Sequence, residues 1–329
     1  MSKFNTVLEN PEYDLCARNV EKDDILIKHL ENYAKECETH IVSLSGGVDS
    51  MVIATILNHL QYKVVCVHIN YNNRKESSLE ADFLEHWAQH NEITFVRKDI
   101  EDMKRGEINR KVYEEYTKSI RFDLYKEVME THGGESVILG HHDDDIVENI
   151  FNNICRGRDL LDLTVMHKES TMMGVNISRP LLGKRKEKVY AFAHTYRVPY
   201  FKDTTPLRSL RGTFRNTIFP ILERSYSGVY ENLMSISSQS DQWGELIADK
   251  MIDPYLSSMT FEETVVTLNI SDHRAYPFCF WRHVLSLLFH KYHRAAPTIR
   301  SVHNFLQAMN RYHSKIKKKK NTSVTINGD

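Results

Sequence analysis

The sequence has few cysteines and no long apolar run. Its five cysteines lie at positions 16, 37, 66, 155 and 279, and no two of them form a CxxC pair. An odd, scattered set of this kind does not build a disulfide framework, a zinc ribbon or a cysteine-held iron–sulfur cluster. No apolar run approaches the ~20 residues that a membrane-spanning helix needs. The polar, acidic start also has no apolar core of a secretory signal. We therefore expect a reducing, cytoplasmic location and no membrane partner.

The charge of the chain is balanced overall but not locally. Lys and Arg number 43 and Asp and Glu 44 in 329 residues, so the formal net charge is −1 and gives no global attraction to nucleic acid. Residues 179–224, however, carry eleven basic and three acidic side chains. This segment and the lysine run 317–320 can follow the phosphates of a nucleic acid. For the lysine run, a solvated chain end remains an alternative.

Strand and helix patterns alternate through the first part of the chain. Apolar runs at residues 40–44, 63–69, 93–96 and 136–140 indicate buried strands. Each of these strands is followed by a helical pattern, at residues 49–60, 77–90, 109–131 and 145–155. Such alternation builds right-handed βαβ units. The sequence therefore predicts an α/β fold with a doubly wound, mainly parallel, Rossmann-like sheet.

The pattern also suggests how the chain is divided. Residues 1–35 are polar with one amphipathic helix at 23–35, and we interpret them as an N-terminal extension. The α/β domain is expected to cover residues 36–226. Residues 227–329 are expected to form a mostly helical domain with a basic tail, with helices at 232–251, 277–293 and 298–312 and a short β excursion at 264–270. The aromatic residues of the second of these helices recur at helical spacing, which favours core packing over base stacking.

The string SGGVDS, residues 45–50, stands where the first strand turns into a helix. Glycines allow a tight turn and a close approach of the backbone to a ligand. The helix start offers unpaired N–H groups that suit an anion. The string is neither a Walker A sequence, nor GxGxxG, nor the GxSxG of hydrolases. A plain turn capped by Ser or Asp is the structural alternative.

A second polar string, GHHDDD, follows the strand at residues 136–140. Asp144 and Asp145 enter a helix there, on the side of the sheet where α/β folds bind ligands. Two adjacent carboxylates can hold Mg²⁺ or accept a proton, and Glu148 lies one helical turn further on. The alternative is acidic capping of the helix. Without HExxH or a third ligand at useful spacing, the two histidines do not predict zinc, and one of them is expected to orient its neighbours.

These strings resemble a known family. SGGVDS resembles the SGGxDS loop of the N-type ATP pyrophosphatases, or PP-loop enzymes, which cleave ATP between the α- and β-phosphates and adenylate a substrate oxygen. HINYNNR with Ser77 and Glu80, HHDDDIVEN with the following Arg-Gly, and RPLL with Asp203 and RN…P resemble segments of tRNA(Ile)-lysidine synthases. The match covers roughly residues 40–225.

The resemblance implies roles for individual residues. The ATP site is implied at Ser45, Gly46, Gly47, Val48, Asp49, Ser50 and His68. The catalytic set is implied to be Asp49, Asp144, Asp145 and Arg215, with Asp49 and Asp145 holding Mg²⁺. Contacts with the tRNA or the second substrate are implied for Arg74, Arg156, Arg179, Arg215 and Asn216.

The reaction implied is adenylation of an anticodon cytidine at C2 and its ligation to free lysine, with tRNA(Ile) as the nucleic-acid partner. The sequence departs from the family pattern where HGLR reads YNNR, where Asn149 follows Glu148, where Asp203 is followed by Thr-Thr-Pro, and where RNTIFPIL is a shortened segment. These departures fall in regions expected to contact tRNA or the second substrate. Three alternatives therefore stay open: a PP-loop tRNA thiolase, a non-catalytic PP-loop protein that binds tRNA or nucleotide, and an amidotransferase-type synthetase. The sequence does not predict the oligomeric state.

Overall fold

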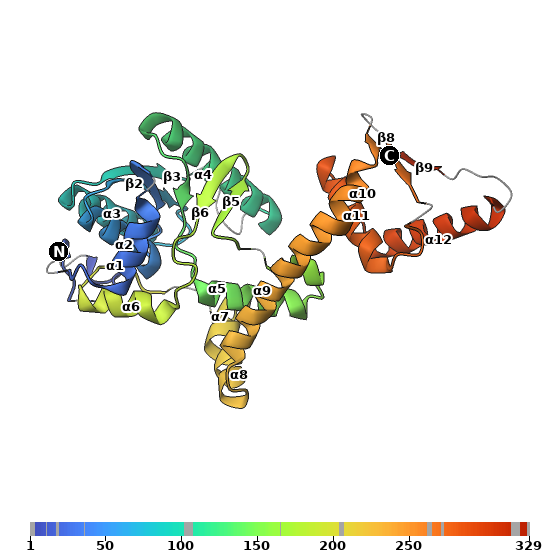
Figure 1. Cartoon of the computed structure of the whole chain (residues 1–329). Helices are drawn as coiled ribbons and strands as arrows, with labels where there is room; N and C mark the ends of the chain where they lie inside the picture. Colours follow the sequence, from blue (N-terminus) through green and yellow to red (C-terminus); the bar gives the residue numbers. More distant parts are fainter. Residues whose placement is uncertain are drawn as a thin grey trace. The chain divides into compact units, whose positions relative to one another are not determined.

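The computed structural model describes residues 4–10, 12–17, 20–35, 37–101, 108–164, 166–203, 207–261, 265–270, 273–316 and 323–327. The chain divides into two compact units, and Figure 1 labels many of their helices and strands. The first unit holds Met1–Asn152 with Thr164–Met234, and the second holds Asn153–Leu163 with Ser235–Asp329. No helix in the described part of the chain has the length and apolar character needed to cross a membrane.

A six-stranded sheet forms the centre of the first unit, in the order β3-β2-β1-β4-β6-β5. The strands are β1 (Thr39–Ser43), β2 (Lys63–Asn70), β3 (Thr94–Asp99), β4 (Val137–Ile138), β5 (Glu169–Met172) and β6 (Val175–Ser178). All neighbours run parallel except β5 and β6, which form an antiparallel hairpin. The predicted doubly wound, mainly parallel sheet is confirmed. The hairpin was not predicted, because its two strands are only four residues long and β5 (ESTM) is largely polar.

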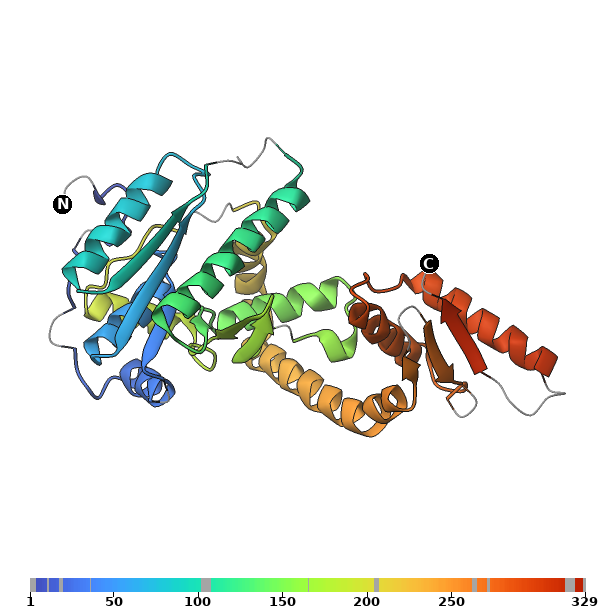
Figure 2. The same ribbon diagram turned by 90° about the horizontal axis from the view of Figure 1, so that it is seen from above.

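Helices cover both faces of this sheet. They are α1 (Ile25–Ala34), α2 (Val48–His59), α3 (Ser77–His90), α4 (Arg110–His132) and α6 (Lys186–Thr195). Figure 2 shows α3 and α4 on opposite sides of the strands. Because successive side chains of a strand point to opposite faces, Ile41 joins the core beneath α4, whereas Val42 joins the core that α1, α2, α3 and α6 share.

The N-terminal segment packs into the second of these cores. Phe4, Val7 and Leu8 are buried there together with residues of α1 and α2. Leu8 forms an isolated antiparallel bridge with Phe201. The segment predicted as an extension therefore contributes apolar side chains to the core of the first unit. Its helix α1 begins after Asp24, whose side chain caps it by accepting a hydrogen bond from the Leu26 N–H.

The remaining helices of the first unit follow β4 or lie between α6 and α9 in the chain. They are α5 (Asp143–Cys155), whose last residues belong to the second unit, α7 (Leu210–Thr213), the π-helical turn η3 (Phe214–Ile218) and α8 (Phe219–Ser225). A π turn changes the rotation of the helix locally and is frequent at functional sites. It carries Arg215.

The second unit is mostly helical, as predicted. Its elements are η2 (Leu160–Asp162), α9 (Val229–Ile247), whose first residues belong to the first unit, η4 (Ala248–Ile252), α10 (Asp253–Ser257), β7 (Thr260–Phe261), β8 (Val265–Asn269), α11 (Phe278–Lys291), α12 (Ile299–Ile316) and β9 (Ser323–Asn327). Phe280 and Trp281 are buried in its core, which confirms their packing role. The predicted β excursion corresponds to β8, which lies between β7 and β9 in an antiparallel sheet. The lysine run 317–320 lies outside the described residues.

Candidate active site

The two polar strings meet at the carboxyl ends of β1 and β4. From β1 the sheet continues outward through β2 and β3, and β4 then lies on the other side of β1. Open α/β sheets form a ligand crevice at such a switch point, outside the carboxyl ends of the strands. Residues 44–50 follow β1 and residues 139–145 follow β4. The topology therefore brings SGGVDS and GHHDDD to one edge.

The SGGVDS loop is braced by its own serines. Ser50 Oγ accepts a hydrogen bond from the Ser45 N–H at 3.2 Å and donates one to the Gly47 carbonyl at 3.0 Å. Ser45 Oγ accepts from the Gly47 N–H at 3.2 Å. The residue that precedes α2 is Gly47, and its cap has no side-chain hydrogen bond. The structure therefore does not have the alternative, a helix capped by a Ser or Asp side chain. The uncapped N–H groups at the start of α2 suit an anion.

Two glycines let neighbouring segments approach this loop. Gly46 has φ +80°, and a Cβ at that position would lie 2.0 Å from the Phe201 ring. The Gly46 carbonyl accepts a hydrogen bond from the Phe201 N–H at 2.9 Å. A Cβ at Gly140 would lie 2.8 Å from the Asp49 Cβ. Without glycine at these places, neither the end of β4 nor the segment of Phe201 could lie so close to the loop.

His142 lies among three carboxylates. Its side chain is 2% exposed. Its Nε2 lies 3.4 Å from Asp145 Oδ2 and 3.8 Å from Asp49 Oδ1, and its Nδ1 lies 3.4 Å from Asp144 Oδ2. The ring therefore lies between acids from both strings. Among the described residues no group of three or more His, Cys, Asp or Glu side chains is arranged as a metal site.

Asp145 is the centre of a carboxylate–arginine cluster. Its Oδ1 contacts Nη2 of Arg211 and, at 2.6 Å, Nη2 of Arg215. Arg215 Nε also donates to Glu148 Oε2 at 2.8 Å. Burial raises the pKa of Asp145, but the charges of His142 and the arginines outweigh it, so this pKa lies below its ordinary value. Burial lowers the pKa of Arg215, but Asp145 and Glu148 raise it above the ordinary value.

Residues 183–186, which lead into α6, contact acids of both polar strings. Lys186 Nζ lies 2.5 Å from Asp49 Oδ2, and the Lys186 N–H donates to Asp144 Oδ2 at 2.8 Å. The Gly183 N–H donates to Asp143 Oδ1 at 2.6 Å. Burial raises the pKa of Asp144, but the adjacent His142 ring and the hydrogen bond from the Lys186 N–H keep it below its ordinary value. Each of the three aspartates of the DDD string thus accepts a hydrogen bond, either from residues 183–186 or from the arginine cluster.

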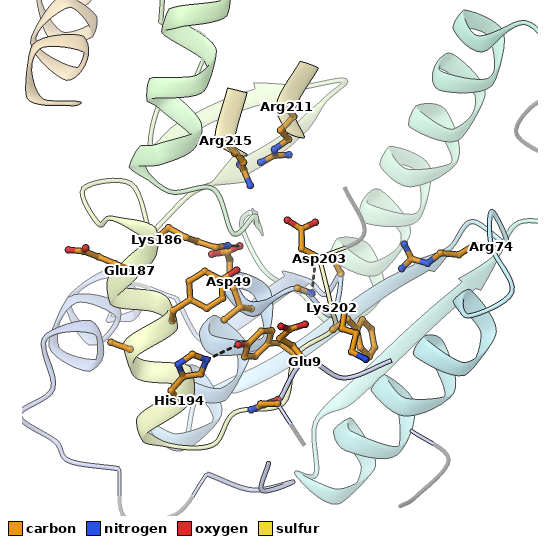
Figure 3. Close-up of a pocket in the computed structure, with 18 residues that line it drawn as sticks. Glu9, Asp49, Arg74, Lys186, Glu187, His194, Lys202, Asp203, Arg211 and Arg215 are labelled. Carbon is orange, nitrogen blue, oxygen red and sulfur yellow. Dashed lines mark hydrogen bonds and ion pairs between the residues drawn. The ribbon is translucent and has the colours of Figure 1, made fainter. Parts of the chain in front are cut away.

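Two hollows meet at this cluster. The larger, of about 1180 Å³, lies between the loop, α6 and the N-terminal segment, and Figure 3 shows its lining. The smaller, of about 750 Å³, lies over the ends of β1 and β2 and is lined by His68, Asn70 and Gly140 among others. The residues that line both are Ser45, Asp49, Arg74 and Arg211. The two hollows therefore adjoin each other beside the SGGVDS loop.

Besides residues of the SGGVDS loop and Arg215, the predicted binding residues His68 and Arg74 line these hollows. His68 is 7% exposed, its Nδ1 lies 2.8 Å from the Leu44 carbonyl, and burial lowers its pKa. It therefore supports the end of β1 beside the smaller hollow. Arg74 bonds both oxygens of Glu80 through Nη2, at 2.7 and 2.5 Å.

The three other residues predicted to contact substrate lie elsewhere. Arg179 is 5% exposed and is held by the His167 carbonyl and Ser170 Oγ, both at 2.9 Å. Asn216 is exposed and donates to the Gly212 carbonyl. Arg156 is exposed in the second unit. None of the three is among the residues that line the two hollows, and their roles stay predictions.

Sequence reasoning missed Lys186 and Arg211 as site residues. Both belong to the basic segment 179–224, and nothing in the segment distinguishes them from its nine other basic residues. The one usable signal is position: Lys186 follows RPLL and opens a helix, and Arg211 stands four residues, one helical turn, before Arg215.

Comparison with known proteins agrees with this geometry. The family model described as the PP-loop domain matches residues 20–222. The chain belongs to the PP-loop family. The PP-loop strings of the site all lie within that span, whereas residues 4–10 lie outside it.

Several curated relatives of this PP-loop protein are named tRNA(Ile)-lysidine synthase. A tRNA(Ile)-lysidine synthase from Enterococcus faecalis is 30% identical over 226 residues, which are 67% of this chain and 48% of that protein. A tRNA(Ile)-lysidine synthase from Chlamydia muridarum is 27% identical over 230 residues, which are 68% of this chain and 70% of that protein. The chain thus spans about half the length of the first relative.

Among solved structures, a U34-tRNA thiolase from Methanococcus maripaludis matches with a TM-score of 0.52 and 18% identity. The match covers 67% of this chain and 78% of that one. At this identity the match supports the fold alone.

Proposed function

We propose that this PP-loop protein is an ATP-dependent ligase that modifies tRNA(Ile) by joining free lysine to C2 of an anticodon cytidine. The observation that carries the proposal is the meeting of the SGGVDS loop with the Asp145–Arg215 cluster at the switch point of the sheet. The names of the curated relatives support the choice of reaction. The products are lysidine in the tRNA, AMP and pyrophosphate, and the setting is the cytoplasm, where tRNA and ATP are present.

ATP binds with its β- and γ-phosphates at residues 45–50. The uncapped start of α2 supplies N–H groups and the positive end of the helix dipole. Ser45 and Ser50 add hydroxyls, and Lys186 adds a cation within reach of the loop. The hollow lined by His68 and Gly140 receives the nucleoside.

The residues present fit a magnesium ion. Carboxylates are hard oxygen ligands, and Asp49 Oδ1 is buried without a hydrogen-bond donor in the described part of the chain. Mg²⁺ is usually held by one or two carboxylates together with phosphate oxygens, so Asp49 and Asp145 are sufficient protein ligands. When bound, Mg²⁺ neutralises phosphate charge and polarises the P–O bonds.

The first chemical step is adenylation. The cytidine C2 oxygen forms a bond to the α-phosphorus, the bond from that phosphorus to the bridging oxygen breaks, and pyrophosphate leaves. Arg211 and Arg215 lie beside the loop and are suited to stabilise the charge that develops on the phosphate oxygens. A carboxylate with a lowered pKa is a weak base near neutral pH, so Asp145 serves to hold the arginines and the Mg²⁺ and not to accept a proton.

The second step is transfer to lysine. The neutral ε-amine forms a bond to C2, the bond from C2 to the AMP oxygen breaks, and the nitrogen releases a proton. The basic segment 179–224 is available to follow tRNA phosphates. Its affinity for tRNA should fall steeply as salt concentration rises.

The test is nucleoside mass spectrometry after incubation of the protein with tRNA(Ile), Mg²⁺-ATP and isotopically labelled lysine. We expect a labelled cytidine adduct, and none when the anticodon cytidine is replaced by uridine. Asp49→Asn is expected to make neither adduct nor AMP. AMP formed without an adduct would overturn lysine as the nucleophile and point to another, sulfur first.

A further inference from the structure

The N-terminal segment forms one wall of the larger hollow, although it lies outside residues 20–222 that the PP-loop family model matches. The Glu9 N–H donates to the Tyr200 carbonyl at 3.0 Å, and the Lys202 N–H donates to the Val7 carbonyl at 3.1 Å. These bonds flank the bridge between Leu8 and Phe201. Phe201 also packs on Gly46, so this one residue connects the N-terminal segment with the SGGVDS loop.

This attachment holds Glu9 at the hollow. The next residue, Asn10, donates from Nδ2 to the Val198 carbonyl at 2.8 Å, which fixes the chain on the other side. Glu9 is exposed and lines the hollow. Among the described residues it has no salt-bridge partner, in contrast to Asp49, Asp145 and Glu148. Figure 3 shows Glu9 across the hollow from Arg211 and Arg215.

The surroundings of Glu9 suit a cation. Tyr190 and Tyr200 line the same hollow with ring centroids 5.8 Å apart. Burial raises the pKa of Tyr190, with the charges of Asp49 and Asp203 and, to a smaller extent, Glu9 adding to it. Burial, with smaller effects of Tyr190 and Glu9, raises the pKa of Tyr200 to about 12. Both phenols are therefore neutral near pH 7. A carboxylate beside aromatic faces is an arrangement that binds ammonium groups.

The hollow also offers a charge of the opposite sign. Lys202 lines it, two residues beyond Tyr200, and its Nζ donates to the Thr6 carbonyl at 3.4 Å near the surface. A free amino acid carries an ammonium and a carboxylate on one carbon, so Glu9 and Lys202 together match its head group. A polyamine has ammonium groups but no carboxylate, so it could pair with Glu9 but not with Lys202.

We propose that Glu9 binds the α-ammonium of the free amino acid substrate and so sets its orientation in the hollow. This inference rests on the proposed function for the identity of that amino acid, lysine. Glu9 binds the α end because a carboxylate raises the pKa of a bound ammonium and keeps it protonated. The nitrogen that attacks C2 must be neutral, so the ε-amine has to lie away from Glu9, toward the arginine cluster.

The experiment compares wild type with Glu9→Gln and, as a matched control, Glu12→Gln, an exposed glutamate near Glu9 in sequence that does not line the hollow. We expect KM for lysine to rise at least tenfold in Glu9→Gln, with kcat and tRNA-dependent ATP–pyrophosphate exchange measured without lysine unchanged. Glu12→Gln should match wild type. With Nα-acetyl-lysine, which lacks the α-ammonium, wild type and Glu9→Gln should have the same KM. An equal loss with both substrates would overturn the proposal.

A calorimetric titration of lysine into each protein gives a readout that needs no turnover. Lysine should bind Glu9→Gln at least tenfold more weakly than wild type. If this holds while no lysidine forms, the proposed function is wrong and the role of Glu9 stands. If wild type and Glu9→Gln bind lysine alike, the role of Glu9 is wrong even where lysidine does form.

Discussion

Lys186 Nζ and Asp49 Oδ2 lie 2.5 Å apart, although 137 positions separate the two residues in the chain. Lys186 is the first residue of α6, and Asp49 lies in the first turn of α2. Both side chains are one-fifth exposed and line the larger hollow. Because a triphosphate carries more negative charge than one carboxylate, we expect Lys186 to exchange Asp49 for a phosphate oxygen when ATP binds.

The first prediction concerns this lysine. Lys186→Ala is expected to lower the rate of tRNA-dependent ATP–pyrophosphate exchange by about 100-fold, the usual effect of removing one donor from a developing charge. The control is Lys188→Ala, an exposed position on the same helix that does not line the hollow. Equal effects of the two substitutions would show that Lys186 contributes only to the general charge of α6.

The second prediction concerns the fork of Arg215. Its Nη2 and Nε contact Asp145 and Glu148 at 2.6 and 2.8 Å. A lysine cannot make both bonds, so Arg215→Lys should lose exchange activity almost as completely as Arg215→Ala. In both variants the free energy of unfolding should fall by about 1–3 kcal/mol, because a buried carboxylate loses a hydrogen-bond partner. Exchange assays and urea unfolding check this, with the exposed Arg224→Ala as the unaffected control.

The central part of the site follows from the sequence for a topological reason. Asp49 and Asp145 each stand just after a strand of a parallel sheet, and parallel strands end at a common edge. The sequence alone does not say which strands are neighbours in the sheet. The pairing of β1 with β4 in the structure supplies this. The motif strings therefore predicted this much of the site without any knowledge of side-chain contacts.

The remaining contacts could not be read from local pattern. Arg211 reaches Asp145 across 66 positions and Lys186 reaches Asp49 across 137, and no periodicity within their own segment marks which basic residue does so. Glu9 is a lone acid in a polar start, and only its pairing with the strand-like segment at Tyr200 brings it to the hollow. Such partners are fixed by tertiary packing, and the hydrophobic pattern specifies packing faces, not these pairings.

The third prediction is a dependence of stability on pH. The pKa of Asp145 is lower in the folded protein than its ordinary value of about 3.9. A lowered folded pKa gives stability that is complete above the unfolded pKa and is lost as pH falls through the folded pKa. Urea unfolding should therefore show the largest gap between wild type and Asp145→Asn above about pH 5, narrowing below about pH 4. The exposed Asp123→Asn should show a gap near zero throughout. A constant gap for Asp145→Asn would contradict the assignment.

The fourth prediction separates two reasons for the glycine at position 46. Gly46 and Gly133 both have φ +80°, but a Cβ at Gly46 would lie 2.0 Å from the Phe201 ring, whereas a Cβ at Gly133 would meet nothing within 4 Å. Gly133→Ala should therefore lower the free energy of unfolding only by the cost of holding a non-glycine residue at positive φ, about 1–3 kcal/mol. Gly46→Ala should lose more than this and should also weaken ATP binding, because the loop must move.

The contact with Phe201 can be tested directly. Phe201→Leu removes the ring atoms that an alanine Cβ would meet, so the double variant Gly46→Ala with Phe201→Leu should bind ATP more tightly than Gly46→Ala alone. The two changes should be non-additive, as expected for residues in contact. Calorimetric ATP binding and urea unfolding of the four proteins of this cycle measure both effects. If the losses simply add, the left-handed backbone alone explains the glycine, and the close packing of Phe201 on the loop has no part in ATP binding.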